Sequence, residues 1–159
     1  MNAKSVGDIV TQLQLMLNQL VSAPSAAEKE AIAGSLDEIF ETILVRKMRL
    51  SRDIAENSIR TLVREAGSAS VNELRSELLH TLVTASMVAS VADASIDPRD
   101  VLEFLPGLEG ENLEYALAIL GFSGHEEVAE RIHEYTSHAS PSIREAASIA
   151  LRELLERRS

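Results

Sequence analysis

Apolar residues recur at spacings of three and four residues along almost the whole chain, and no segment alternates apolar and polar residues for long. Near the start this spacing is shown by Val6, Val10, Leu13, Leu17 and Leu20. Such a repeat follows the turn of an α-helix, whereas a half-buried strand repeats every two residues. The sequence therefore predicts an all-α protein. The first stripe fits docking on the next helix as well as pairing with a second copy of the chain.

Polar capping residues predict where several helices begin. Ser25 and Ser70 each stand before an apolar stretch and have a Glu three residues later, which is the capping-box pattern. Asp97 is followed by Pro, which is favoured at the first position of a helix. Gly67 is expected to end the third helix. The fourth helix, from Ser70 to about Ala92, is apolar on nearly every side, so we expect it in the middle of the core.

The last third of the chain is predicted to hold shorter helices, at residues 98–105, 111–120, 125–138 and 141–157. With four helices before them, these make about eight helices, or four helical hairpins. No linker is long enough to divide the chain, and its 159 residues suit one domain with a real core. We therefore expect a single all-α domain over 1–159, with an irregular helical half at 1–95 and two hairpin repeats at 96–159.

A shift of thirty residues overlays the last two hairpins. Small, aliphatic or aromatic residues meet at the inward positions, in the pairs Leu102 with Ile132, Leu105 with Tyr135, Leu113 with Ile143, Ala116 with Ala146, Leu117 with Ala147, and Ile119 with Ile149. A fixed period in this range indicates stacked units that bury their apolar faces only against their neighbours.

The segment SPSIREAASIAL at residues 140–151 strongly resembles the second helix of a HEAT repeat. Such helices begin with Pro, place an aliphatic residue and an Arg next, and continue with small residues. This chain has Pro141, then Ile143 and Arg144, then a series of Ala. With its thirty-residue period, the segment looks most like the short HEAT-like repeats of the phycobilin lyases. The likeness is weaker over 98–124 and is not found before residue 90.

The resemblance implies a right-handed α-α superhelix, here a short HEAT-like solenoid. In such repeats the Arg equivalent to Arg144 usually ties neighbouring repeats together. Their second helices line the concave side of the stack, where partners usually dock. HEAT-like repeats serve many functions, so the resemblance identifies a scaffold and leaves the function open.

The charge of the chain narrows the class of partner. A formal charge of −10, from 25 acidic and 15 basic residues, disfavours binding to nucleic acid or to anionic membranes. The absence of Cys excludes disulfides, thiol catalysis and thiolate metal sites. The N-terminus shows no signal peptide, and the most apolar run, residues 78–92, is too short to span a bilayer. We therefore expect a cytoplasmic protein whose partner is another protein, the acidic surface being suited to a basic one.

Two histidines raise the question of a metal site. His125 and His133 each precede a Glu, and the dipeptides resemble those from which HEAT-like deoxyhypusine hydroxylase builds its di-iron centre. In that family they recur once per repeat, whereas here both lie on one predicted helix, about 80° apart around its axis. Glu126, Glu130 and His133 share a face, but a solvated face rich in Glu is much commoner. We predict no metal and no cofactor.

Other polar residues are expected to have structural roles. His80, with Glu77 one turn before it, is predicted to be a locally hydrogen-bonded His of the core or a groove. The basic cluster at 46–52 has acidic neighbours, so its charges are expected to pair within the chain, and Ser51 indicates that a new helix starts there. No Ser, His and Asp suggest a nucleophile, and the turn at 121–124 lacks the pattern of a phosphate-binding loop. The sequence predicts no enzyme.

On the second helices of the last two hairpins, the outward positions are Glu114, Tyr115, Ala118, Glu145, Ser148 and Arg152. We predict that they form a partner-binding face with an exposed Tyr115 as its anchor. The function that fits best is a non-enzymatic protein–protein interaction module, an adaptor or inhibitor-like protein. An immunity or antitoxin-type protein that neutralises a basic toxin is one alternative. A cofactor-handling lyase or maturation factor, suggested by the resemblance to phycobilin lyases, is another.

Overall fold

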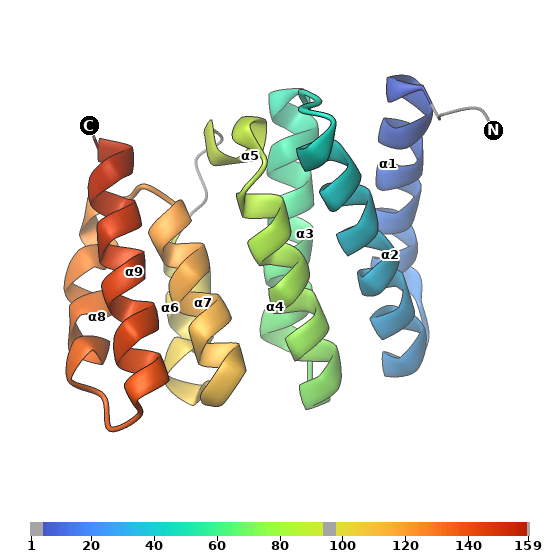
Figure 1. Ribbon diagram of the computed structural model, residues 1–159. Coiled ribbons are helices and arrows are strands. Elements are labelled where there is room, and N and C mark those ends of the chain that lie inside the picture. The colour runs from blue at the N-terminus through green and yellow to red at the C-terminus, as the bar shows by residue number, and fades with distance from the viewer. Residues whose placement is uncertain (1–4, 94–97, 159) are drawn as a thin grey trace. The chain divides into compact units, whose positions relative to one another are not determined.

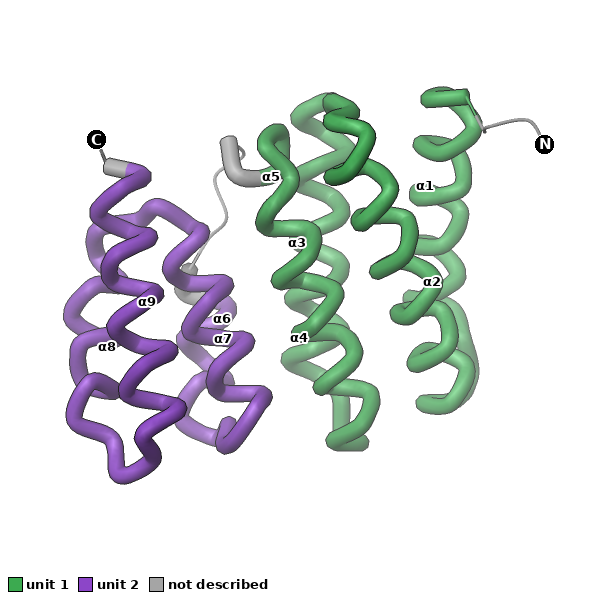
Figure 2. Tube along the Cα trace, in the orientation of Figure 1, with its two compact units in different colours: residues 1–94 green, residues 95–159 purple. Residues whose placement is uncertain are grey.

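The computed structural model describes residues 5–93 and 98–158 (Figure 1). These residues form α-helices, short 3-10 helices and turns, and no strand occurs among them, which confirms the all-α prediction. The chain divides into two compact units, unit 1 at residues 1–94 and unit 2 at residues 95–159 (Figure 2). The division falls one residue before the boundary expected between the N-terminal half and the two hairpin repeats, and the single domain over 1–159 stays a prediction. No helix in the described ranges is long and apolar enough to cross a membrane.

Unit 1 contains two helical hairpins followed by a short helix. Its elements are α1 (Val6–Ser22), α2 (Ala26–Val45), α3 (Arg52–Ser68), α4 (Asn72–Ser86) and α5 (Ala89–Asp93). α1 packs on α2 and α3, and α4 packs on α2 and α3, so α1 and α3 form one layer and α2 and α4 the other (Figure 1). The most extensive contact in the unit is between α2 and α4.

The buried side of α1 differs at its start from the predicted stripe. Leu13, Leu17 and Leu20 are buried as expected. One turn earlier the buried residue is Ile9, and Val6 is 50% exposed. Ile9 lies four residues before Leu13 and Val10 lies three residues before it. Both spacings fit one face of a helix, so the pattern alone did not distinguish Ile9 from Val10. The stripe packs on α2 and α3 within the unit.

Two of the predicted helix starts are confirmed by their capping bonds. The hydroxyl of Ser25 accepts a hydrogen bond from the backbone N–H of Glu28 at 3.2 Å, and α2 follows it. The hydroxyl of Ser51 accepts one from the N–H of Ile54 at 3.3 Å at the start of α3. Each bond satisfies an N–H that has no partner inside the helix.

The connection between α3 and α4 is not the one predicted. Ser70 is not the cap, because α4 begins two residues later without a side-chain cap, and Gly67 lies inside α3. The guanidinium of Arg75 on α4 instead donates to the carbonyls of Ala66 at 3.1 Å and Ala69 at 2.6 Å. A cation from the next helix thus satisfies the end of α3, which needs no glycine there.

The fourth helix is buried as predicted but ends earlier. It ends at Ser86 rather than near residue 92, and a separate helix, α5, follows. Its buried apolar residues are Leu74, Leu78, Leu79, Leu82 and Ala85. After the break, the hydroxyl of Ser90 on α5 accepts a hydrogen bond from the backbone N–H of Leu50 at 3.1 Å. The described ranges therefore hold nine α-helices, one more than the predicted eight.

Unit 2 also contains two helical hairpins, built from shorter pieces. Its elements are α6 (Pro98–Phe104), the 3-10 helix η1 (Leu105–Gly107), α7 (Gly110–Phe122), η2 (Glu126–Val128), α8 (Ala129–Glu134), η3 (Tyr135–Ser137) and α9 (Pro141–Arg158). α6 begins at Pro98 as predicted, while Asp97 lies outside the described residues. The predicted helix at 125–138 is wrong: α8 covers only its middle and 3-10 turns form both ends. The main contact of the unit joins α7 and α9.

The contact between α7 and α9 depends on two small residues. A Cβ built on Gly121 would lie 2.9 Å from both the Cα and the carbonyl oxygen of Ala150. The two helices therefore meet backbone to backbone at this point, and only Gly fits on α7. The small side chain of Ala150 on α9 permits this close approach.

Of the six overlaid pairs, two are buried in both hairpins, three pair a buried residue with a half-buried one, and one fails. Leu113 and Ile143 are both buried, but Ile119 is fully buried and Ile149 is 51% exposed. The buried stripe of α9 is narrow, consisting of Ile143, Ala147, Ala150 and Leu154. Ile149 lies about 100° around the helix from Ala150, outside that stripe. Its predicted inward position is wrong.

Candidate functional site

The predicted binding residues lie on α7 and α9, which pack side by side in unit 2 (Figure 1). Those on α9 are exposed, namely Glu145, Ser148 and Arg152. Those on α7 are half-buried, namely Glu114, Tyr115 and Ala118. The structure thus brings all six onto two adjacent helices, with the more accessible half on α9.

The three residues of α9 share one face of the helix. At about 100° per residue, Glu145, Ser148 and Arg152 fall within about 60° of one another, on the side opposite the buried stripe. None of the three side chains makes a hydrogen bond or ion pair with another described residue. Their side chains are therefore available to polar groups of a partner.

Tyr115 is not the exposed anchor that the sequence predicts. It is half-buried, and its hydroxyl donates to the carboxylate of Glu111 on the same helix. The two residues are four apart, which places them on one side of α7 one turn from each other. The ring is held in place, but its polar end already has a partner.

Ile149 is the residue of this face that sequence reasoning missed. It is 51% exposed and lies about 40° around α9 from Glu145, at the edge of the face that Glu145, Ser148 and Arg152 form. The overlay on buried Ile119 concealed it. The spacing of the small and apolar residues of α9, taken on its own, places position 149 outside the buried stripe and would have found it.

Arg144 has a local role instead of the one expected from the resemblance. Its Nη1 donates to the carbonyl of His138 at 2.8 Å and to that of Ala139 at 3.1 Å. Both carbonyls belong to the turn between η3 and α9, inside the same hairpin. The guanidinium therefore fixes the turn that leads into α9, and no bond to a neighbouring repeat is made by these donors.

The two histidines that each precede a Glu do not lie on one helix. His125 precedes η2, with its Nδ1 3.8 Å from Glu127 Oε1, whereas His133 is an exposed residue of α8. In the part of the chain that the structure describes, no three His, Asp or Glu residues are grouped closely enough to hold a metal ion. The arrangement offers local ion pairing rather than a shared ligand set.

His80 joins two helices of unit 1. Its Nδ1 lies 3.4 Å from Asp37 Oδ1 on α2, and the hydroxyl of Thr84 donates to the same oxygen at 2.6 Å. Asp37 is a partner that the sequence does not show, because it lies on a different helix. The imidazole is half-exposed and the carboxylate mostly buried. The cluster ties α4 to α2.

The basic cluster near residue 46 pairs within the chain at Arg52. Arg52 Nε lies 2.7 Å from Glu56 Oε1, one turn later on α3. The hydrogen bond and charge of Glu56 raise the pKa of Arg52 above its ordinary value. The expected intramolecular pairing is confirmed for this residue.

Comparison with known proteins finds no matching family model, no matching curated protein and no matching solved structure.

Proposed function

We propose that the protein is a non-enzymatic protein-binding module that holds its partner on the outward face of α9. The observation that carries the proposal is Ile149, a large aliphatic side chain left 51% exposed among polar residues. Protein interfaces commonly place an apolar residue at the centre and polar residues around it. Glu145, four residues before Ile149, and Arg152, three residues after it, flank it on one side, and Ser148 lies further round on that side.

The helices around this face support rigid docking. α9 is held against α7 by the backbone contact at Gly121 and Ala150, and its first turn is fixed by Arg144. A face presented by a fixed helix loses little conformational freedom on binding, which favours affinity. Glu114, Tyr115 and Ala118 on α7 extend the face at its side.

The HEAT-like resemblance is part of the same proposal. Stacked helical hairpins within each unit are what a HEAT-like solenoid requires, and the second helices, including α7 and α9, form one layer of their unit (Figure 1). In such a scaffold the face on α7 and α9 is the surface at which partners dock. The protein is then a cytoplasmic adaptor or inhibitor-like protein, without a cofactor.

The test compares two substitutions of exposed aliphatic residues. Ile149→Asp changes the apolar residue of the α9 face, and Val21→Asp changes a residue that is 56% exposed but lies on α1 in unit 1. Each variant and the unchanged protein serve as bait for affinity capture with quantitative mass spectrometry. We expect a partner that is retained by the unchanged protein and Val21→Asp and lost by Ile149→Asp.

A second comparison examines the polar part of the face. The double change Tyr115→Ala with Glu145→Lys is expected to weaken binding of the partner that Ile149→Asp loses. If this double variant and Ile149→Asp both retain every partner of the unchanged protein, the face is wrong. Thermal unfolding of each bait checks that all are folded.

A further inference from the structure

We propose that the groove between α1 and α2 is a second docking site, which accepts a basic amphipathic helix of a partner protein. The site lies in unit 1 and is independent of the face on α9. It goes beyond the function proposed above, because it specifies both a separate surface and the chemistry of what covers it.

The groove has an apolar floor between two helices that pack side by side (Figure 1). Its central part has a volume of about 380 Å³ and is lined by Ile9 and Met16 of α1 and by Ile39 and Thr42 of α2, among others. Ile9 and Ile39 are buried beneath it, and Met16 is half-buried. Met adapts its shape to different apolar partners, which suits a binding floor.

The groove extends along both helices beyond this central part. Along α1 a hollow is lined by Asp8, Thr11, Gln12 and Leu15, and it shares Gln12 with the central part. These four positions have the spacing of a single helix face.

A matching hollow follows α2. It is lined by Glu38, Glu41, Thr42, Val45 and Arg46, and three of these also line the central part. The first four have the same spacing as their counterparts on α1. Because each hollow shares lining residues with the central part, we take the three together and call them the trough.

Two aliphatic side chains stand exposed at the edges of the trough. Leu15 on α1 is 53% exposed and Val45 on α2 is 79% exposed. They add apolar surface beside the floor, and an apolar surface rimmed by polar residues is typical of an interaction site. A groove between two helices accepts the ridge of a third helix, whose apolar side chains recur every three or four residues.

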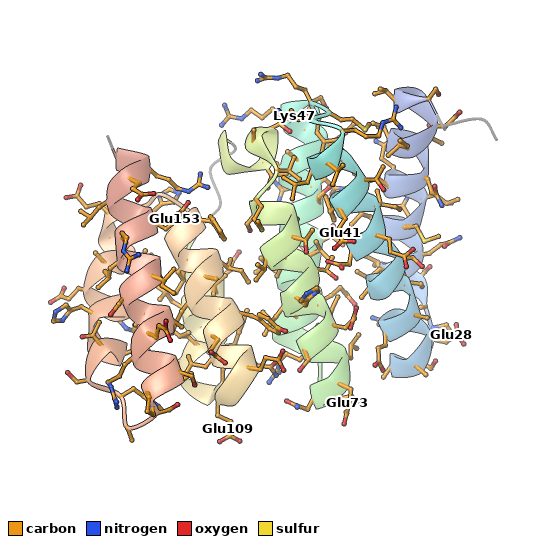
Figure 3. All side chains as sticks on the ribbon, viewed as in Figure 1. Glu28, Glu41, Lys47, Glu73, Glu109 and Glu153 are labelled. Atoms are coloured by element: carbon orange, nitrogen blue, oxygen red, sulfur yellow. The ribbon has the colours of Figure 1, made fainter. Side chains whose placement is uncertain are left out.

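The charge of the lining selects the kind of helix. The trough is lined by the carboxylates of Asp8, Glu38 and Glu41 and by one guanidinium, that of Arg46, which gives a formal charge of −2. No described basic side chain forms an ion pair with these three carboxylates. Figure 3 marks Glu41 on α2. A helix with Lys or Arg beside its apolar stripe therefore meets opposite charge at the edges.

The same charge argues against the other occupants. A second copy of the chain would bring another −10 to an acidic trough, and an anionic membrane would meet like charge. A small apolar ligand would leave the exposed Leu15 and Val45 uncovered, because both lie at the edges of the trough.

The experiment uses a model peptide of about 18 residues made of Leu and Lys, with Leu at helical spacing and a fluorescent label. A peptide of the same composition in scrambled order tests whether charge alone is sufficient. Binding to the full chain is measured by fluorescence anisotropy, and amide chemical shifts locate the peptide on the protein. We expect the patterned peptide to bind at α1 and α2, with an affinity that falls as salt rises.

Matched variants separate the trough from the overall charge. Glu38→Lys with Glu41→Lys changes two carboxylates of the trough, and Glu103→Lys with Glu130→Lys changes two exposed carboxylates of unit 2. Both pairs alter the net charge equally. We expect the first pair to weaken peptide binding by about tenfold relative to the second. Leu15→Gln is expected to weaken it as well, whereas Val21→Gln, at another exposed position of α1, leaves it unchanged.

Several results would overturn the proposal. Equal affinity of the two charge variants, equal binding of the scrambled peptide, or shifts confined to unit 2 would each do so. A concentration-dependent dimer that Leu15→Gln disrupts would assign the trough to a second copy instead. Ile149→Asp is expected to leave peptide binding unchanged, so loss of the α9 face and loss of the trough are distinguishable. Circular dichroism melts confirm that each variant is folded.

Discussion

The Cα of Ala150 lies only 2.9 Å from the position that a Cβ on Gly121 would occupy. This contact joins α7 to α9 and so positions the proposed binding face. It also yields the sharpest test of the fold, because a single methyl group is enough to disturb it.

Gly121→Ala is expected to lower the free energy of unfolding by about 1–3 kcal/mol, since the added methyl must push two backbones apart. The gain in helix propensity, about 1 kcal/mol, is included in that net loss. Urea unfolding followed by circular dichroism measures the difference. An unchanged midpoint would mean that α7 and α9 are not in backbone contact.

Gly34→Ala provides the matched control, with the opposite sign. A Cβ at Gly34 on α2 would lie 3.5 Å from Glu77 Oε1, an ordinary contact with the end of a flexible side chain. The helix propensity of Ala then dominates, and we expect stability to rise by about 0.5–1 kcal/mol. The same urea series would contradict this prediction by showing a loss.

Arg144→Ala removes the two hydrogen bonds to the carbonyls of His138 and Ala139. The side chain is exposed, so solvent replaces part of what is lost, and we expect a cost of about 1 kcal/mol. Arg152→Ala, another exposed Arg of α9, is expected to be neutral for stability because it bonds to no described residue. Equal melting temperatures for the two variants would refute the role given to Arg144.

Tyr135 is expected to ionise at higher pH in the folded chain than in the unfolded one, because burial raises the pKa of its phenol. The folded state then holds the proton more tightly. Its contribution to stability is present below the unfolded pKa, about 10, and is lost as pH rises through the folded pKa.

Tyr115→Phe makes this measurable, since the chain has two Tyr and Tyr135 then remains alone. Its phenolate absorbance is titrated in buffer and again in concentrated urea. The midpoint in buffer should lie above the midpoint in urea. Coincident midpoints would show that the ring is not buried as described.

Local features of the fold were predictable, whereas features that depend on another helix were not. Ser25 and Ser51 cap their helices because the bond spans only three residues of the same segment. The same pattern failed at Ser70, where Arg75 from the following helix satisfies the preceding one. No spacing within one segment reports such a contact.

For the proposed binding surfaces too, only part of what the structure shows could be predicted from the sequence. The repeat overlay placed Glu145, Ser148 and Arg152 outward, and they are exposed, but the same overlay put exposed Ile149 inside. The trough between α1 and α2 combines Leu15 with Val45, and only the packing of the hairpin brings their helices together. The charge of the whole chain was visible in the sequence; its concentration at the trough required the structure.

The hydrogen bond from the backbone N–H of Leu50 to the hydroxyl of Ser90 makes the motion of α5 measurable at a single amide. The amide of Leu50 precedes α3, yet its acceptor lies in α5, forty residues further along the chain. Its hydrogen exchange therefore reports the detachment of α5 rather than the unwinding of a helix of its own. Exchange at Leu50 that is faster than in the middle of α4 would reveal a partly opened state, in which the short helix has lifted while the two hairpins remain intact.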